Sequence, residues 1–141
     1  MEKDSPVIRT IKWYGVIVGI INLISGFFYI LIYLMVSIFT TEEFPQIIAS
    51  LDERILIIEF VLIFSGANQL MLSFNSKNFL NQKYVYFIFV IYSLIIPIIL
   101  LFGLWPFTVI NSFFNLVYGL LIGSLIFKMR NNIVINKYSL N

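Results

Sequence analysis

The sequence contains neither cysteine nor histidine. Without these residues the chain cannot form disulfides, use a thiol in redox chemistry, or hold a metal ion through thiolate or imidazole ligands. A Ser-His-Asp hydrolase and a zinc-dependent membrane protease are excluded for the same reason. Because the sequence also shows no catalytic or nucleotide-binding motif, we predict a protein that is not an enzyme and that requires no cofactor or metal ion.

Charge is scarce as well. Only 11% of the residues are charged, whereas a soluble domain carries about a quarter. The net charge of +2 is small and the positive residues do not form one patch, so nucleic-acid binding is not expected. Alanine is almost absent, while Ile, Asn, Phe and Lys are abundant. This composition follows AT-rich codons and is typical of a low-GC bacterial source.

Apolar residues are in excess: they make up 60% of the chain and give a mean hydropathy of +0.97. Four long apolar runs each contain about the twenty residues that a helix needs to cross the ~30 Å hydrocarbon core of a bilayer. They cover residues 13–39, 55–74, 84–104 and 107–127. The sequence therefore predicts a single all-α domain over residues 1–141, an integral membrane bundle of four transmembrane helices.

Basic residues gather on one predicted side of the membrane. All except Arg54 precede span one, lie between spans two and three, or follow span four. The loop at 40–54 is acidic, with Glu42, Glu43, Asp52 and Glu53. The positive-inside rule then places both termini in the cytoplasm and the acidic loop outside the cell membrane. Trp13 and Trp105 fall at opposite faces, where aromatic belts are expected.

Local signals mark several helix ends. Ser50 and Glu53 have the spacing of a capping box directly before span two, and Pro106 fits the first position of span four after a tight outer turn. Residues 40–51 have the spacing of a short amphipathic helix on the outer surface, and an irregular loop fits them equally well. The polar tail at 131–141 is expected to be a frayed helix end.

Small and polar residues recur at steps of three or four along spans one and four, so each set forms one stripe. In span one they are Gly15, Gly19, Asn22, Gly26, Tyr29, Tyr33 and Ser37. In span four they are Thr108, Asn111, Ser112, Asn115, Gly119 and Gly123. Because lipid provides no hydrophobic force between helices, close approach over small residues and interhelical hydrogen bonds hold them together. Both stripes contain a GxxxG motif and are predicted to face protein, with packing inside the chain favoured over self-association.

Spans two and three show weaker patterns. The small and polar positions are Ser65, Gly66, Asn68 and Gln69 in span two, and Tyr92 and Ser93 in span three. Pro97 cannot donate a hydrogen bond to the Ser93 carbonyl, so we expect a kink and a free carbonyl in span three. Because span three is the least polar, we predict that spans one, two and four form the tighter core and that span three faces more lipid.

Glu59 is the one ionisable residue inside a predicted span. An acid within the membrane is by default a candidate proton or cation site. Glu59 also lies only about a turn and a half from the predicted outer end of span two, where its carboxylate can reach the headgroup level or pair with Arg54. The interfacial interpretation is favoured, because charges near the interface cost little.

Several amide side chains lie within the spans: Asn22, Asn68, Gln69, Asn111 and Asn115. They can line a polar path or bind a small solute, or they can link helices through hydrogen bonds that contribute on the order of 0.6 kcal/mol each. The second interpretation is favoured, because no charge accompanies the amides. For the tyrosines of the spans, packing with a hydrogen-bonded hydroxyl is favoured over stacking on a ligand.

Two functional hypotheses follow. The first is a non-enzymatic multi-pass membrane protein that acts through helix contacts with another membrane protein, in an accessory, regulatory or immunity-type role. It depends on the small size of the soluble segments and on the lack of any reactive set of residues. The alternative is a small oligomeric transporter or channel that uses Glu59 and the Asn-rich helix faces, for which the partner is a second copy of the chain.

Overall fold

The computed structural model describes residues 5–39, 53–75, 79, 81–103 and 106–138. Within these residues the chain is helical without strands, and four helical segments are long and apolar enough to cross a membrane. The elements are α1 (Pro6–Phe39), α3 (Glu53–Phe74), α4 (Gln82–Val90), η2 (Ile91–Ile95), α5 (Ile96–Leu101) and α6 (Pro106–Tyr138). The third span consists of α4, η2 and α5. The predicted all-α bundle of four transmembrane helices is confirmed.

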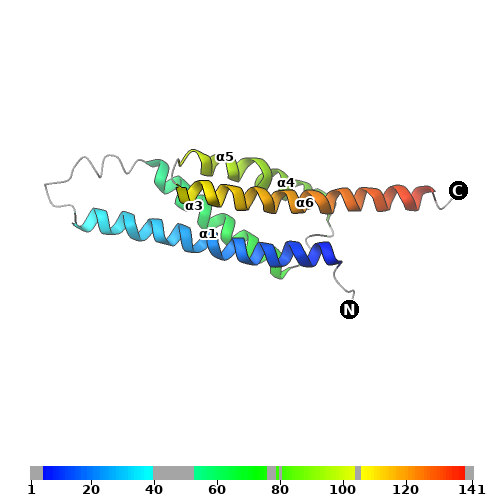
Figure 1. The fold of residues 1–141 in the computed structure, drawn as a ribbon, viewed down its shortest axis with the longest axis horizontal. Helices are drawn as coiled ribbons and strands as arrows, with labels where there is room; N and C mark the ends of the chain where they lie inside the picture. Colours follow the sequence, from blue (N-terminus) through cyan, green and yellow to red (C-terminus); the bar gives the residue numbers. More distant parts are fainter. Residues whose placement is uncertain (1–4, 40–52, 76–78, 80, 104–105, 139–141) are drawn as a thin grey trace.

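The first and last helices are longer than the apolar runs that predicted them. They begin at Pro6 and Pro106, where the fixed φ and missing N–H of proline suit a first turn. The last helix continues to Tyr138, through the tail for which a frayed end is predicted, and projects past the other helices (Figure 1). The predicted amphipathic helix at 40–51, the capping box before span two and Trp105 lie outside the described residues.

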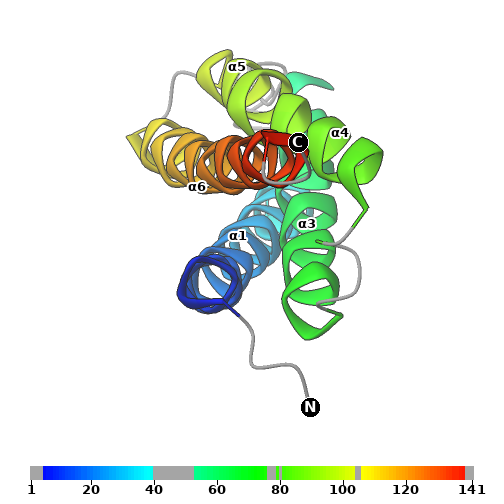
Figure 2. The same ribbon diagram turned by 90° about the vertical axis from the view of Figure 1, so that its right-hand side faces the viewer.

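The helices form two closely packed pairs (Figure 1, Figure 2). The most extensive contact joins α1 to α3, and the third span lies along α6. Contacts between α1 and α6, and between α3 and α5, hold the pairs together. The first residues of α1 and the last residues of α6 lie at the same end of the bundle (Figure 1), as an even number of spans requires.

Glycines allow the close approach of α1 and α3. A β-carbon at Gly66 would lie only 2.7 Å from the carbonyl oxygen of Gly19, and one at Gly26 would lie 2.6 Å from Cγ1 of Ile63. A β-carbon at Gly15 would meet Ser73 of α3 and the ring of Tyr118 of α6. The glycines of the span-one stripe therefore face protein as predicted, and its GxxxG motif is used inside the chain.

The third span packs closely against α6. It lies along α6, and its fully buried Tyr92 and Leu100 belong to the common core. Gly119 of α6 contacts the backbone of Tyr92 and Ser93, so that a β-carbon there would lie 2.6 Å from the Ser93 nitrogen. In the most apolar stretch of span three 33% of the residues are buried, as in span one, against 39% in spans two and four. Span three therefore faces outwards more than spans two and four, as predicted, but not more than span one. It packs through apolar side chains against glycines of α6 and needs no polar stripe of its own.

The irregularity predicted near Pro97 takes the form of a π-helical turn. This turn, η2, directly precedes α5, and Pro97 lies in the first turn of α5. A π-helical turn accommodates a position at which the regular helical hydrogen bond is missing. The carbonyl of Pro97 accepts a hydrogen bond of 2.9 Å from Ser112 Oγ of α6. This bond is one more link between the third span and α6.

Large apolar side chains cover the outside of the bundle. Phe28, Phe60, Phe87 and Phe113, from four different spans, are each more than half exposed. The interior instead holds polar and small residues beside its apolar ones. This distribution suits a lipid environment, in which the apolar surface is solvated by acyl chains and polar groups are satisfied between helices.

Candidate functional site

Three of the predicted amides meet in the centre of the bundle. Asn22 lies near the middle of α1, Gln69 on α3 and Asn115 on α6, and all three side chains are fully buried. Each belongs to the small and polar positions of its span, which face the other helices. We call this set the amide cluster.

The amide cluster is closed by hydrogen bonds among its own members. Asn22 Nδ2 donates to Gln69 Oε1 at 3.0 Å and to Asn115 Oδ1 at 3.1 Å. Gln69 Nε2 donates to Asn115 Oδ1 at 2.9 Å. Asn115 Nδ2 donates to Asn22 Oδ1 at 3.2 Å and to the carbonyl of Asn111 at 2.7 Å. Every side-chain oxygen therefore accepts at least one bond, and every amide nitrogen donates at least one.

This geometry joins the two helix pairs. Asn22 and Gln69 come from α1 and α3, and Asn115 comes from α6. The interhelical hydrogen bonding favoured for the amides is thus present at these three residues. A carboxamide does not ionise near neutral pH, and a set whose groups already bond to one another offers little to a solute. The arrangement is suited to holding helices together.

Tyrosines extend the polar core along α6. Tyr92 OH donates to the Ser65 carbonyl at 3.0 Å, which links the third span to α3. The Tyr118 ring lies edge-on to the Tyr92 ring, with 5.0 Å between the ring centroids, and nearly parallel to the Tyr14 ring, with 6.4 Å between the centroids. Tyr14 OH donates to the Phe114 carbonyl at 3.3 Å. Sequence reasoning missed Tyr14, although its position next to the glycine stripe of span one places it towards α6.

Glu59 lies apart from the amide cluster and is only 3% exposed. Its backbone contacts α1, since a β-carbon at Gly26 would lie 3.3 Å from the Glu59 carbonyl oxygen. Among the described residues, Oε1 of Glu59 has no hydrogen-bond partner. The side chain of Glu59 is thus covered by other parts of the chain, and its interfacial position stays a prediction. The side chain of Arg54 lies outside the described residues.

The other two candidate amides stay outside the cluster. Asn68 is half-buried, and within the described structure its Oδ1 accepts no hydrogen bond. Asn111 is buried and contributes its carbonyl to Asn115, while its own Nδ2 has no partner among the described residues. No group of three or more acidic side chains in the described ranges can hold a metal ion, and most of the acidic loop lies outside them.

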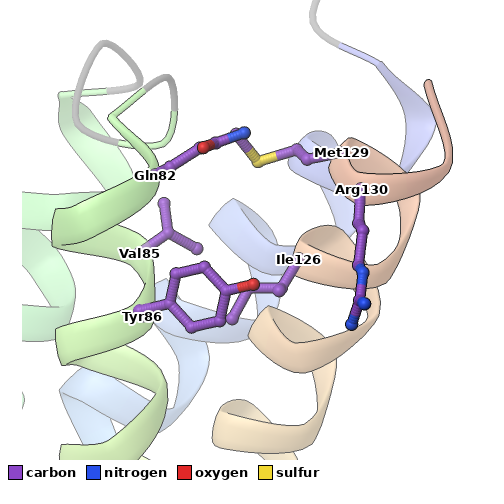
Figure 3. Close-up of a pocket in the computed structure, with 6 residues that line it drawn as sticks. All are labelled: Gln82, Val85, Tyr86, Ile126, Met129 and Arg130. Carbon is purple, nitrogen blue, oxygen red and sulfur yellow. The ribbon is translucent and has the colours of Figure 1, made fainter. Parts of the chain in front are cut away.

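A small groove lies between α4 and α6 near the end of the bundle that holds the start of α1 (Figure 3). Its volume is about 170 Å³, below the ~300 Å³ at which most ligand pockets begin. Figure 3 shows the Tyr86 ring pointing towards Ile126, with the Arg130 side chain running along α6 beside it. The lining residues are Gln82, Val85, Tyr86, Ile126, Met129 and Arg130.

Comparisons of the chain with protein-family models, with curated proteins and with solved structures gave no match.

Proposed function

We propose that this chain is a non-enzymatic multi-pass membrane protein that acts by binding another membrane protein, in an accessory, regulatory or immunity-type role. The observation that carries this proposal is the closed amide cluster. The polar groups at the centre of the bundle are used to fix helices, as in a scaffold, and they do not line a path for a solute.

The outer surface supports the same proposal. The glycines of the two GxxxG motifs contact helices of the same chain, so a partner has to contact the bulky apolar faces. Phe60, Phe87 and Phe113 lie on such faces. Aromatic side chains offer large contact areas at low entropic cost, which makes them effective anchors in protein interfaces.

The first test is purification from native membranes in a mild detergent, followed by mass spectrometry of the co-eluting proteins. We expect a foreign membrane protein in stoichiometric amount. A homogeneous particle that contains only this chain would contradict the proposal.

The contact face can be mapped with a photoreactive phenylalanine analogue. Phe28, Phe60, Phe87 and Phe113 each expose their ring from a different span, so every probe replaces the same residue type. We expect the probe on one face to cross-link the partner and the others to cross-link lipid. Phe79, which is 1% exposed, is the matched interior control and should give only intramolecular products. Cross-links to lipid alone at all four exposed positions would contradict the proposal.

The orientation proposed from charge, with cytoplasmic termini in the cell membrane, can be tested cleanly because the chain has no cysteine. In intact cells, a Ser5→Cys variant should resist a membrane-impermeant maleimide and a Thr40→Cys variant should react. The reverse pattern would overturn this orientation. Arg9, Lys12, Lys128 and Arg130 support the proposal, since they lie towards the end of the bundle that holds the start of α1 and the end of α6.

A second candidate function depends on Glu59. A buried carboxyl group whose Oε1 has no hydrogen-bond partner among the described residues supports proton or cation transport by an oligomer of this chain. Under this alternative, Glu59→Gln abolishes a pH-driven flux into reconstituted vesicles, because glutamine keeps the shape of the side chain and cannot exchange a proton. Asn68→Leu, which changes a polar residue of the same helix outside the cluster, should leave that flux intact. Full activity of Glu59→Gln would exclude the alternative.

A further inference from the structure

A larger groove lies between α1 and α3, at the end of the bundle where α1 begins and α3 ends. Its volume is about 360 Å³, within the range of ligand pockets. It is lined by Arg9, Lys12, Trp13, Val16, Ser73 and Phe74. The groove combines cationic, aromatic and apolar groups, and neither the amide cluster nor the proposed partner contact accounts for them.

The cationic part of the groove suits a phosphate group. Arg9 and Lys12 are three residues apart on α1 and therefore lie on one face of the helix. The planar guanidinium of arginine matches the oxygens of a phosphate through paired hydrogen bonds. The Ser73 hydroxyl donates to the Gln69 carbonyl at 2.7 Å. Anion recognition is therefore assigned to the two cationic side chains.

The other walls of the groove suit a lipid. Trp13 is 67% exposed, and an exposed tryptophan at the end of a transmembrane helix belongs at the level of the headgroups. Val16 and Phe74 continue the groove with apolar surface. A headgroup at the two cations would thus have its acyl chain alongside Val16 and Phe74.

We propose that this groove binds an anionic phospholipid, with its phosphate at Arg9 and Lys12 and an acyl chain along Val16 and Phe74. Basic pockets between transmembrane helices are a recognised form of headgroup site. Among the residues that the structure describes, no acidic residue lines the groove. Glu53 and Glu59, the acidic residues of the described ranges, lie about 20 Å or more along α3 from Ser73. A zwitterionic headgroup would bring its own cation next to Arg9 and Lys12, so an anionic lipid is preferred.

Trp13 provides the measurement. The chain has two tryptophans, so Trp105→Phe leaves Trp13 as the only one. This variant is placed in phosphatidylcholine vesicles that contain a minority of bromine-labelled phosphatidylglycerol or, in a parallel sample, the same amount of bromine-labelled phosphatidylcholine. We expect bromine-labelled phosphatidylglycerol to quench Trp13 at a concentration on the order of ten-fold lower than bromine-labelled phosphatidylcholine does. This factor corresponds to the attraction typical of each basic residue near a membrane surface.

A charge-matched pair of variants separates a site from general attraction. In the Trp105→Phe background, Arg9→Gln with Lys12→Gln should bring the two lipids to nearly equal quenching. Lys128→Gln with Arg130→Gln removes the same charge from the same end of the bundle and should retain most of the preference. An equal loss in both pairs, or no loss in the first, would overturn the proposal. The two pairs are compared only if their circular dichroism spectra match that of the parent.

Two further arms need no variant in the groove. Raising the salt concentration should weaken the preference of the Trp105→Phe chain for phosphatidylglycerol, because screening acts on the charged headgroup. Soluble glycerol phosphate should fail to restore Trp13 fluorescence, since it lacks the acyl chain. Full restoration by glycerol phosphate would identify a site for a free phosphate and would overturn the lipid as its occupant.

Discussion

Asn115 is the residue on which the amide cluster depends most. Its Oδ1 accepts bonds from both Asn22 and Gln69, and its Nδ2 donates to Asn22 and to the carbonyl of Asn111. Asn115→Leu would leave Gln69 Nε2 without its acceptor and Asn22 Oδ1 without its donor. A buried polar group without a partner costs about 1–3 kcal/mol, while an interhelical bond in a membrane contributes about 0.6 kcal/mol.

We therefore expect Asn115→Leu to lower the free energy of unfolding by about 2 kcal/mol, measured by titration with a denaturing detergent. Asn68→Leu is the matched control, because Asn68 is a half-buried amide outside the cluster. Its change should stay within about 0.5 kcal/mol. Equal destabilisation by the two substitutions would show that the cluster has no special role in stability.

At the level of single residues, sequence reasoning identified candidates but not their arrangement. Asn68 and Gln69 are adjacent in span two and equally polar, yet only Gln69 joins the cluster. The position of α6 decides this, and no pattern within span two contains that information. The interfacial position of Glu59 is predicted from its distance to the end of its own helix, whereas the burial of its side chain depends on how the other helices pack around it.

Among the elements, the contact of α6 with the third span depends on Gly119. A β-carbon at Gly119 would lie 2.6 Å from the nitrogen and 2.8 Å from Cα of Ser93. These are backbone atoms, so no side-chain rotation can relieve the overlap. At Gly123 the nearest atom is Cε2 of the Phe89 ring, at 2.8 Å, and a side chain can rotate.

Gly119→Ala should consequently destabilise the bundle by about 2 kcal/mol, within the range for overpacked cores, and Gly123→Ala should cost clearly less. The comparison uses thermal unfolding of both variants in the same detergent. Each substitution adds one methyl group to the same helix, so helix propensity is matched. A larger effect at Gly123 would contradict the described register between α6 and the third span.

The spans themselves follow from the apolar runs, since only helices of about twenty residues satisfy their backbone inside a bilayer. The protein-facing stripes of spans one and four follow from their period. The pairing of helices does not, because a stripe of glycine and asparagine indicates that a face is buried without indicating against which helix. The third span shows this most clearly. It has few polar residues of its own, and its contact with α6 is indicated by the glycines of α6.

For the molecule as a whole, internal use of the small residues has a consequence for assembly. Close approach between transmembrane helices depends on small residues, and Gly15, Gly19, Gly119 and Gly123 all contact helices of their own chain. The outer faces that remain are bulky and solvated well by lipid. A second copy of the chain therefore offers no glycine face that complements these bulky surfaces. A partner with a small-residue groove of its own does offer such a face.

We accordingly expect the purified chain, freed of the proposed partner, to be a monomer in mild detergent, with the protein mass of 16.4 kDa in native mass spectrometry. The measurement should be repeated over a range of detergent-to-protein ratios, because chance sharing of a micelle falls on dilution and specific association persists. A defined homo-oligomer that survives dilution would contradict this expectation. It would also favour transport over partner binding, because a polar pathway in so small a bundle requires several copies around a shared axis.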